Sequence, residues 1–205
     1  MSPKRALIVI DVQNEYVTGN LRIEYPDVQL SLRNIARAMD GARDAGVPVV
    51  VVQHVAPANS PLFARGSQQA ELHPSVAERP CDLRVEKALA SALARTDLAA
   101  WLRDRQIDTL AVVGYMTHNC DVSTVVQAHH EGWSVELLHD ASGSLPYENT
   151  AGKASAEEIH RAFTVVMNTG FAAVVSTDAW LQAVRDGQAL ASDNIYLSNQ
   201  RARAR

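Results

Sequence analysis

The sequence predicts a single three-layer α/β domain built around a parallel sheet, and two patterns carry that prediction. Short apolar runs rich in β-branched residues recur along the chain, as is typical of strands buried on both faces of a parallel sheet. Longer segments with apolar residues at helical spacing lie between them. Such strand–helix alternation, with right-handed crossovers, places helices on both faces of the sheet. The runs are Ala6–Ile10, Val47–Val52, Leu83–Glu86, Thr109–Val113, Val135–Leu138 and Ala172–Val175.

Five segments have the spacing and the end signals of helices. They are Ser31–Ala45, Asp97–Arg105, Asp121–Glu131, Ala156–Asn168 and Asp178–Arg185. Glycine follows the first at Gly46 and the third at Gly132, where a helix commonly ends. Ser155 and Glu158 form a capping box at the start of the fourth. We expect an apolar stripe of this fourth helix to pack on the sheet, namely Ile159, Ala162, Phe163 and Val166.

Composition limits both the number of domains and the class of partner. The chain has 205 residues, of which 47% are hydrophobic and 20% charged, a balance that favours one globular domain. We assign residues 1–190 to this domain and residues 191–205 to a solvated, frayed C-terminal tail. The formal net charge of −4 gives no reason to expect nucleic acid or a membrane surface as a partner. A small-molecule substrate is the partner that we expect.

Two further features bear on the cellular compartment. The apolar run Ala6–Ile10 is too short for the core of a signal peptide or for a transmembrane span. The chain has only two cysteines, Cys81 and Cys120, which is not the pattern of a disulfide scaffold. We therefore expect a cytoplasmic protein.

Three reactive side chains follow the ends of predicted strands. Asp11 ends the first run, Lys87 ends another, and Cys120 lies shortly after Thr109–Val113 and directly before a predicted helix. Ligands of open α/β sheets bind beyond the carboxyl ends of the strands. A thiol at a helix N-terminus, near an ammonium group, favours the thiolate, and a nearby carboxylate can accept the thiol proton. Each residue alone has an ordinary structural explanation; together they predict a nucleophilic cysteine.

Longer stretches around these residues resemble the isochorismatase-like cysteine hydrolases, the superfamily that includes nicotinamidases and N-carbamoylsarcosine amidohydrolases. The resemblance runs from about Arg5 to Leu181. The segments that carry it are Ala6–Asn14, Glu86-Lys87, Thr109–Cys120 with the following Ser123-Thr124 and Ala128, and Gly132–Ala141.

The resemblance implies a six-stranded parallel sheet of the Rossmann-like type and a catalytic triad. Asp11 would be the general base, Lys87 the electrostatic partner and Cys120 the attacking thiolate. A non-proline cis peptide would join Tyr115 to Met116, and the N–H groups of Met116 and Cys120 would form the oxyanion hole. The implied activity is hydrolysis of a small amide, ureide or related C–N bond through a thioester-type intermediate. The family also favours a homo-oligomer, a dimer or larger.

The sequence departs from its relatives at two places. Nicotinamidases have an Asp-x-His pattern after the second strand that helps to hold a metal, whereas this chain has Gln53-His54-Val55-Ala56. We therefore expect no metal and no other cofactor. Asp121 follows the nucleophile where many relatives have a small apolar residue; it would complement the helix dipole or, pointing inward, oppose the thiolate.

Candidate pocket residues are polar or aromatic side chains near the predicted strand ends. They are Asn14, Tyr16, His54, Phe63, Tyr115 and His118. The connections Val55–Asp82 and Ala141–Ala154 are long for this fold, and we expect them to cover the site or to reach a neighbouring subunit. A disordered insertion is the alternative for the first of them.

Two other functions stay open from the sequence. The same fold supports isochorismate-type vinyl-ether hydrolysis, although members with that chemistry do not need the cysteine. The chain could also be a non-catalytic flavodoxin-like or redox-binding protein, because Cys120 and Ser123 have monothiol-redox spacing at a helix start. That interpretation leaves Asp11 and Lys87 unexplained.

Overall fold

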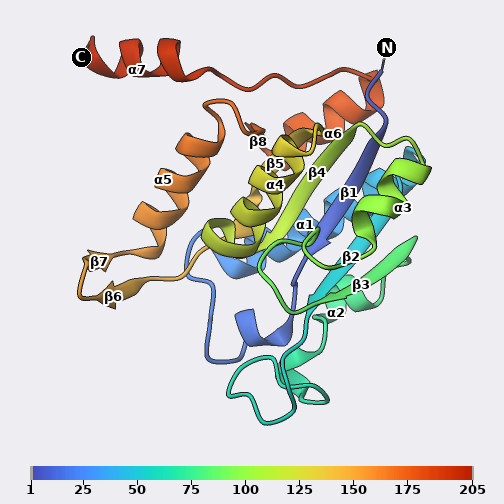
Figure 1. The fold of residues 1–205 in the computed structure, drawn as a ribbon, viewed down its shortest axis with the longest axis vertical. Helices are drawn as coiled ribbons and strands as arrows, with labels where there is room; N and C mark the ends of the chain where they lie inside the picture. The colour runs from blue at the N-terminus through green and yellow to red at the C-terminus, as the bar shows by residue number, and fades with distance from the viewer. Residues whose placement is uncertain (1, 205) are drawn as a thin grey trace.

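A computed structural model describes residues 2–204 and contains one six-stranded sheet in which every strand is parallel to its neighbours (Figure 1). The strand order is β3-β2-β1-β4-β5-β8, so the order in which successive strands are added reverses between β1 and β4. The predicted parallel α/β sheet is confirmed, with each expected strand present. The strands are β1 (Arg5–Ile10), β2 (Val49–His54), β3 (Leu83–Lys87), β4 (Thr109–Tyr115), β5 (Ser134–Gly143) and β8 (Ala173–Val175).

Helices cover both faces of the sheet and complete the three layers (Figure 1). One face carries α1 (Val28–Asp44), α2 (Pro74–Ala77) and α6 (Thr177–Asp186). The other carries α3 (Leu98–Asp104), α4 (Val122–His130) and α5 (Ala156–Met167). The remaining elements are η1 (Asn14–Tyr16), η2 (Gln68–Ala70), η3 (Thr117–Asp121), the hairpin β6 (Tyr147–Asn149) and β7 (Gly152–Ala154), and α7 (Ile195–Arg203).

Alternation along β1 explains why the strand is apolar from Ala6 to Ile10. Leu7 and Val9 belong to the core beneath α1, while Ile8 and Ile10 belong to the core beneath α3 and α4. Successive strand side chains point to opposite faces, and both faces are covered here, so neither set can be polar. Among residues 2–204, no helix is long and apolar enough to cross a bilayer.

Gly114 allows the end of β4 to approach β1 closely. Its φ is +119°, and a Cβ atom at this position would lie 2.0 Å from the carbonyl oxygen of Ile10. Only glycine fits such an approach, because the obstructing atom belongs to the backbone of the neighbouring strand. The residue therefore helps to bring the segment after β4 beside Asp11.

The two long connections are ordered and fold back on the domain. The segment between β2 and β3 contains η2 and α2, and bridges link Ala56 to Ala64 and Gln13 to Leu72. The alternative of a disordered insertion is therefore wrong. In the second connection, β5 continues to Gly143, beyond the predicted end of this strand at Leu138. The β6–β7 hairpin follows it.

Two details of the helices differ from the expectation. Ala156, His160 and Met167 are the buried residues of α5, and Phe163 of the predicted stripe packs partly buried against the same core, whereas Val166 is 55% exposed. The apolar side chains of α5 outnumber those that its position at the sheet edge can bury. In the tail predicted to be frayed, residues 195–203 form α7, capped by the Asn194 side chain, although none of its residues is buried.

Candidate active site

The carboxyl ends of β1, β3 and β4 bring the three predicted reactive side chains together. Asp11 directly follows β1, Lys87 is the last residue of β3, and Cys120 lies in η3 after β4. The site thus sits where the strand order reverses, the usual ligand position in open α/β sheets. Asp11 has a φ of +51°, a left-handed conformation that non-glycine residues adopt rarely and that clusters at functional sites.

A lysine ammonium stands between the carboxylate and the thiol. Lys87 Nζ lies 2.6 Å from Asp11 Oδ2, and the side chains of both residues have no exposed surface. Lys87 Nζ also donates a hydrogen bond to Cys120 Sγ over 3.3 Å. The Lys87–Asp11 contact is a close ion pair, and its geometry is not that of a directed hydrogen bond to either Asp11 oxygen. The three groups form one buried, directly connected cluster.

The protonation of Cys120 differs from the expectation of a resting thiolate. Burial and the neighbouring Asp11 carboxylate raise the pKa of the Cys120 thiol, and Lys87 offsets only part of this effect. Cys120 also lies within η3 rather than at the start of a helix, so it lacks the full benefit of a helix N-terminus. The resting residue is therefore a thiol, which needs a base when it attacks.

Asp11 and Lys87 have the charges that such a proton transfer requires. Burial raises the pKa of Asp11, and the Lys87 ammonium lowers it again in part. Burial lowers the pKa of Lys87, but the charges of Asp11 and Cys120 outweigh burial and leave it raised. A carboxylate that is ionised yet readily protonated is suited to exchange a proton with a thiol.

His54 borders these three side chains but does not suit a metal. Its Nδ1 lies 3.5 Å from Lys87 Nζ, and burial together with the Lys87 charge lowers the pKa of its imidazole. Gln13 fixes the backbone of His54 by bonding both its carbonyl oxygen and its N–H. An ammonium beside the imidazole would repel a cation, and within residues 2–204 no cluster of three metal-ligating side chains forms. We derive no step through a metal.

The loop after β4 presents backbone groups to the thiol. The peptide bond between Tyr115 and Met116 is cis, and the Met116 carbonyl accepts the N–H groups of Asn119 and Asp121. Within residues 2–204, the N–H of Met116 has no hydrogen-bond partner. Met116 and Cys120 both line the same pocket, so a free N–H beside the nucleophile is available to an oxyanion.

A pocket of about 430 Å³ opens above Cys120 and is lined mainly by apolar and aromatic side chains. Three of the six predicted pocket residues, Tyr16, His54 and Phe63, are part of this lining. The rings of Tyr16 and His54 both pack against Phe63, with centroid separations of 5.3 and 5.2 Å. The full lining is Tyr16, Leu21, His54, Ala56, Ser60, Leu62, Phe63, Ala90, Met116, Asn119, Cys120 and Tyr147.

The other three predicted pocket residues lie outside the lining. The Asn14 amide bonds the carbonyl of Gln68 and thereby ties down the β2–β3 connection. Tyr115 is fully buried, with its hydroxyl 2.6 Å from Ser31 Oγ. His118 lies behind the pocket and contacts it only through a neighbouring tyrosine. Asn14 in η1, Tyr115 in β4 and His118 in η3 direct their side chains away from this cavity, which residue type and position along the chain do not determine.

Tyr147 is one of the pocket residues that the sequence did not reveal. It lies on β6, its hydroxyl is 3.0 Å from His118 Nε2, and His118 Nδ1 is 3.0 Å from Ser144 Oγ. Burial lowers the pKa of His118 to about 4, so the imidazole is neutral and can hold the hydroxyl at one nitrogen. The length of the connection after β5 was the available signal, since it indicated a covering segment without naming a residue.

Asp121 points inward, which is one of the two interpretations that the sequence left open. Its side chain is fully buried, and neither of its oxygens has a hydrogen-bond partner that meets the angular criteria. Burial raises its pKa to about 7; a nearby Ser142 hydroxyl and Lys87 oppose this effect, while Asp11 adds to it. A second carboxyl group thus lies beneath the cluster of Asp11, Lys87 and Cys120.

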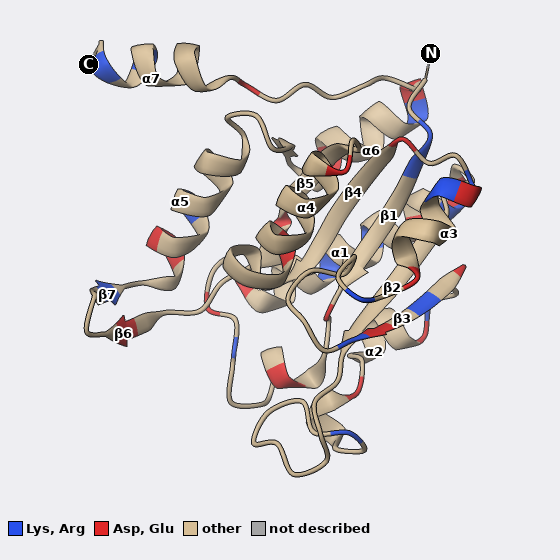
Figure 2. Cartoon of the chain, viewed as in Figure 1, with Lys and Arg blue, Asp and Glu red and all other residues tan. Residues whose placement is uncertain are grey.

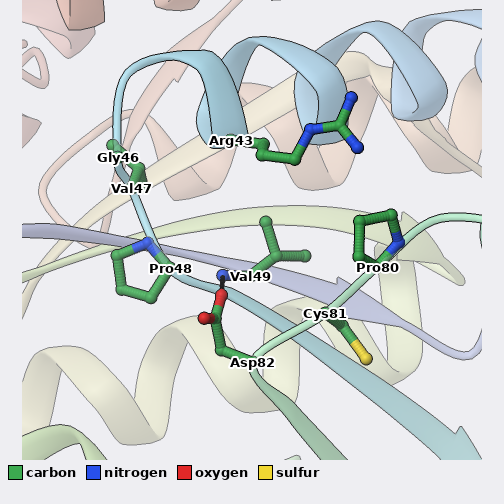
Figure 3. A pocket seen from close by; sticks show the side chains of 8 residues that line it. All are labelled: Arg43, Gly46, Val47, Pro48, Val49, Pro80, Cys81 and Asp82. Atoms are coloured by element: carbon green, nitrogen blue, oxygen red, sulfur yellow. Dashed lines mark hydrogen bonds between the residues drawn. The ribbon is translucent and has the colours of Figure 1, made fainter.

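A separate cavity of about 250 Å³ lies at the opposite end of the sheet (Figure 3). It is bordered by Val49 at the start of β2 and by Asp82, whose carboxylate accepts the Val49 N–H. Cys81 also lines it, and in Figure 3 its sulfur points away from the Arg43 guanidinium. The two cysteines therefore occupy opposite ends of the sheet, too far apart to act as a dithiol.

The chain belongs to the isochorismatase family, because the model for the isochorismatase domain matches residues 5–179. The chain is similar to a crystal structure of an isochorismatase homologue from Burkholderia xenovorans LB400. The two are 70% identical with a TM-score of 0.99, and the match covers 100% of this chain and 98% of the other.

Two curated relatives extend the comparison. An isochorismatase family protein of Bacillus subtilis, YddQ, is 30% identical over 86% of this chain and 98% of its own length. The ureidoacrylate amidohydrolase RutB of Methylobacterium radiotolerans is 27% identical over 87% of this chain and 78% of its own. The expected family resemblance is thereby confirmed.

Proposed function

We propose that this isochorismatase-family hydrolase cleaves the C–N bond of a small amide or ureide with Cys120 as its nucleophile. The observation that carries the proposal is the buried chain of contacts from Asp11 through Lys87 to Cys120, at 2.6 and 3.3 Å, on the floor of a pocket. A thiol, a base and a fixed cation in contact are the elements of nucleophilic catalysis.

The reaction begins with a proton transfer. Asp11 takes the proton of the Cys120 thiol while the sulfur attacks the substrate carbonyl carbon, forming the C–S bond. Lys87 stays charged and stabilises the sulfur as its negative charge develops. The carbonyl oxygen becomes an oxyanion, which the N–H groups of Met116 and Cys120 would bind; loss of one such donor typically costs about 100- to 1000-fold in rate.

The cycle closes with two further transfers through Asp11. The protonated Asp11 gives its proton to the departing nitrogen, the C–N bond breaks, and the acyl group remains on Cys120 as a thioester. Asp11 then removes a proton from water, whose oxygen attacks the thioester carbonyl. The acid leaves, and the proton returns from Asp11 to the Cys120 sulfur.

The lining favours an uncharged, flat substrate. Among the described residues, no arginine or lysine belongs to the pocket wall, and Lys87 at its floor is already paired with Asp11. The lowered pKa of His54 leaves that imidazole neutral. A substrate carboxylate would therefore be desolvated without a cation to receive it. Aromatic rings, by contrast, offer stacking surfaces on which a planar amide can lie.

The same observation counts against vinyl-ether hydrolysis, because isochorismate carries two carboxylates. The redox alternative is also less favoured, because it gives no role to the Asp11–Lys87 pair that contacts Cys120. A reduced Cys81 and Cys120 suit the cytoplasm, which we keep as the proposed location.

The test is a substrate panel with ammonia detection. It pairs neutral aromatic and aliphatic amides with carboxylate-bearing ureides of similar size. We expect turnover of neutral amides, and we expect Cys120→Ala to abolish it while the far-ultraviolet circular dichroism spectrum stays unchanged. Turnover retained by Cys120→Ala would refute the nucleophile, and a preference for carboxylates would refute the substrate class.

A further inference from the structure

The C-terminal helix α7 has an apolar surface that its own chain does not cover. Ile195, Tyr196 and Leu197 are 72%, 68% and 49% exposed, and α7 contains no buried residue. A nine-residue helix is too short to be stable alone in water, since most helical stability in proteins comes from packing of an apolar face. Its persistence as a helix therefore requires a covering surface.

The path of the chain leads α7 away from its own domain. After α6 ends at Asp186, an extended segment runs along one side of the molecule, and α7 stands clear of the sheet and its helices (Figure 1). The Burkholderia xenovorans crystal structure superposes on 100% of this chain with a TM-score of 0.99, so the arm follows the same path there. The domain of the same chain therefore does not cover α7.

A second uncovered surface with matching properties lies on α5. Val165 and Val166 near its C-terminus are 63% and 55% exposed. Glu158 precedes Val165 by seven residues, which is close to two helical turns, and therefore lies on the same outward side. The exposed Arg161 between them is paired with Glu157. The outward side of α5 is acidic at its N-terminus and apolar at its C-terminus.

The two surfaces are complementary when the helices run antiparallel. In α7 the apolar residues come first and the basic residues last, with Tyr196 and Arg203 seven residues, or about 10 Å, apart on one side. Val165 and Glu158 on α5 have the same separation in the opposite order. Figure 2 shows the acidic start of α5 and the basic end of α7. Arg201 already pairs with Asp193, so Arg203 is the cation that remains. Glu158 accepts the Ser155 N–H and hydroxyl through Oε2, which leaves its Oε1 for Arg203.

We propose that α7 of one copy docks antiparallel on the outward side of α5 of a second copy. Each chain carries both an arm and a receiving surface, so a reciprocal exchange between two copies would close a two-fold dimer. The docking covers the apolar turn Ile195–Leu197 with Val165 and Val166 and places Arg203 beside Glu158.

Disulfide trapping tests the contact between copies. In a Cys81→Ser background, one chain carries Val166→Cys and a separate chain carries Leu197→Cys; the two are mixed and mildly oxidised. We expect a linked species of twice the 22.3 kDa chain mass in the mixture and little of it in either variant alone. The matched control replaces Val166→Cys by Leu89→Cys, an apolar position that is 42% exposed elsewhere on the surface, and should not link.

Light scattering on the unmodified chain provides the second measurement. A dimeric mass is expected, with Tyr196→Asp shifting the protein toward the monomer at least tenfold in dissociation constant and Leu89→Asp leaving it unchanged. Both positions are exposed, so neither variant should impair folding. A monomeric mass of the unmodified chain would overturn the proposal. So would a disulfide that forms within one chain when Val166→Cys and Leu197→Cys are combined, because α7 would then dock on its own domain.

Discussion

Replacing Asp121 by asparagine should remove a pH dependence of stability that the buried carboxyl group creates. The pKa of Asp121 is raised from 3.8 to about 7, chiefly by burial, in a side chain with no exposed surface. Between these two pH values the folded protein holds a proton that the unfolded chain has released. The stability contributed by the protonated form is therefore fully present below about pH 4 and is lost as the pH rises to about 7 and beyond.

The magnitude follows from the same two values. A change of one in pKa corresponds to about 1.4 kcal/mol, so the span from 3.8 to about 7 corresponds to a loss on the order of 4 kcal/mol between pH 4 and pH 8. The asparagine side chain of the variant has nearly the same shape as aspartate and does not titrate. The free energy of unfolding of the wild type should thus fall relative to Asp121→Asn across this range.

Urea unfolding at several pH values from 4 to 8 measures this difference directly. Groups far from Asp121 are present in both proteins and cancel in the comparison, whereas Asp11 interacts with Asp121, so both curves are measured again in an Asp11→Asn background. Asp121 and Lys87 are close enough to interact, so the Asp121→Asn curve is also compared with that of Asp121→Asn combined with Lys87→Met. Parallel curves for wild type and Asp121→Asn would refute a buried, protonated Asp121.

Three further predictions address the backbone, the core and the pocket. Gly114→Ala should abolish folding or activity because its Cβ would meet the Ile10 carbonyl at 2.0 Å, whereas Gly132→Ala, with nothing within 4 Å, should cost only about 1 kcal/mol of backbone strain in urea unfolding. Glu136→Gln should lower the free energy of unfolding by about 3–5 kcal/mol, because it leaves the buried Arg5 without its ion-pair partner; an unchanged unfolding midpoint would contradict this. Tyr147→Phe should raise KM about fivefold with little change in melting temperature, since it removes a hydroxyl held by His118 at the pocket edge; steady-state kinetics with an unaltered KM would remove Tyr147 from substrate binding.

The fold could be predicted because its determinants are local. Continuous apolar runs such as Ala6–Ile10 are possible only where both faces are covered, and this pattern locates the strands of a parallel sheet. Asp11, Lys87 and Cys120 could be predicted for a related reason. Strand ends of a parallel sheet meet at one edge, so residues at those ends come together whatever the loops do.

The parts that could not be predicted depend on tertiary environment. The protonation of Cys120 is set by burial and by Asp11, neither of which the local sequence contains. Pocket residues were assigned by residue type, so Tyr115 at the end of β4 was included although it is fully buried against Ser31, and Tyr147 was missed. The stripe on α5 was assigned by helical spacing, which shows an apolar side but not whether the sheet or a second copy covers it.

The central claim is that Cys120 becomes acylated through proton transfer to Asp11. Its most direct test is intact-protein and peptide mass spectrometry of acid-quenched samples taken during turnover of a neutral amide. The account predicts an acyl adduct on the peptide that contains Cys120 in the wild type, and none in Asp11→Asn or Cys120→Ala. Turnover without any adduct on Cys120, or an equal adduct in Asp11→Asn, would contradict it.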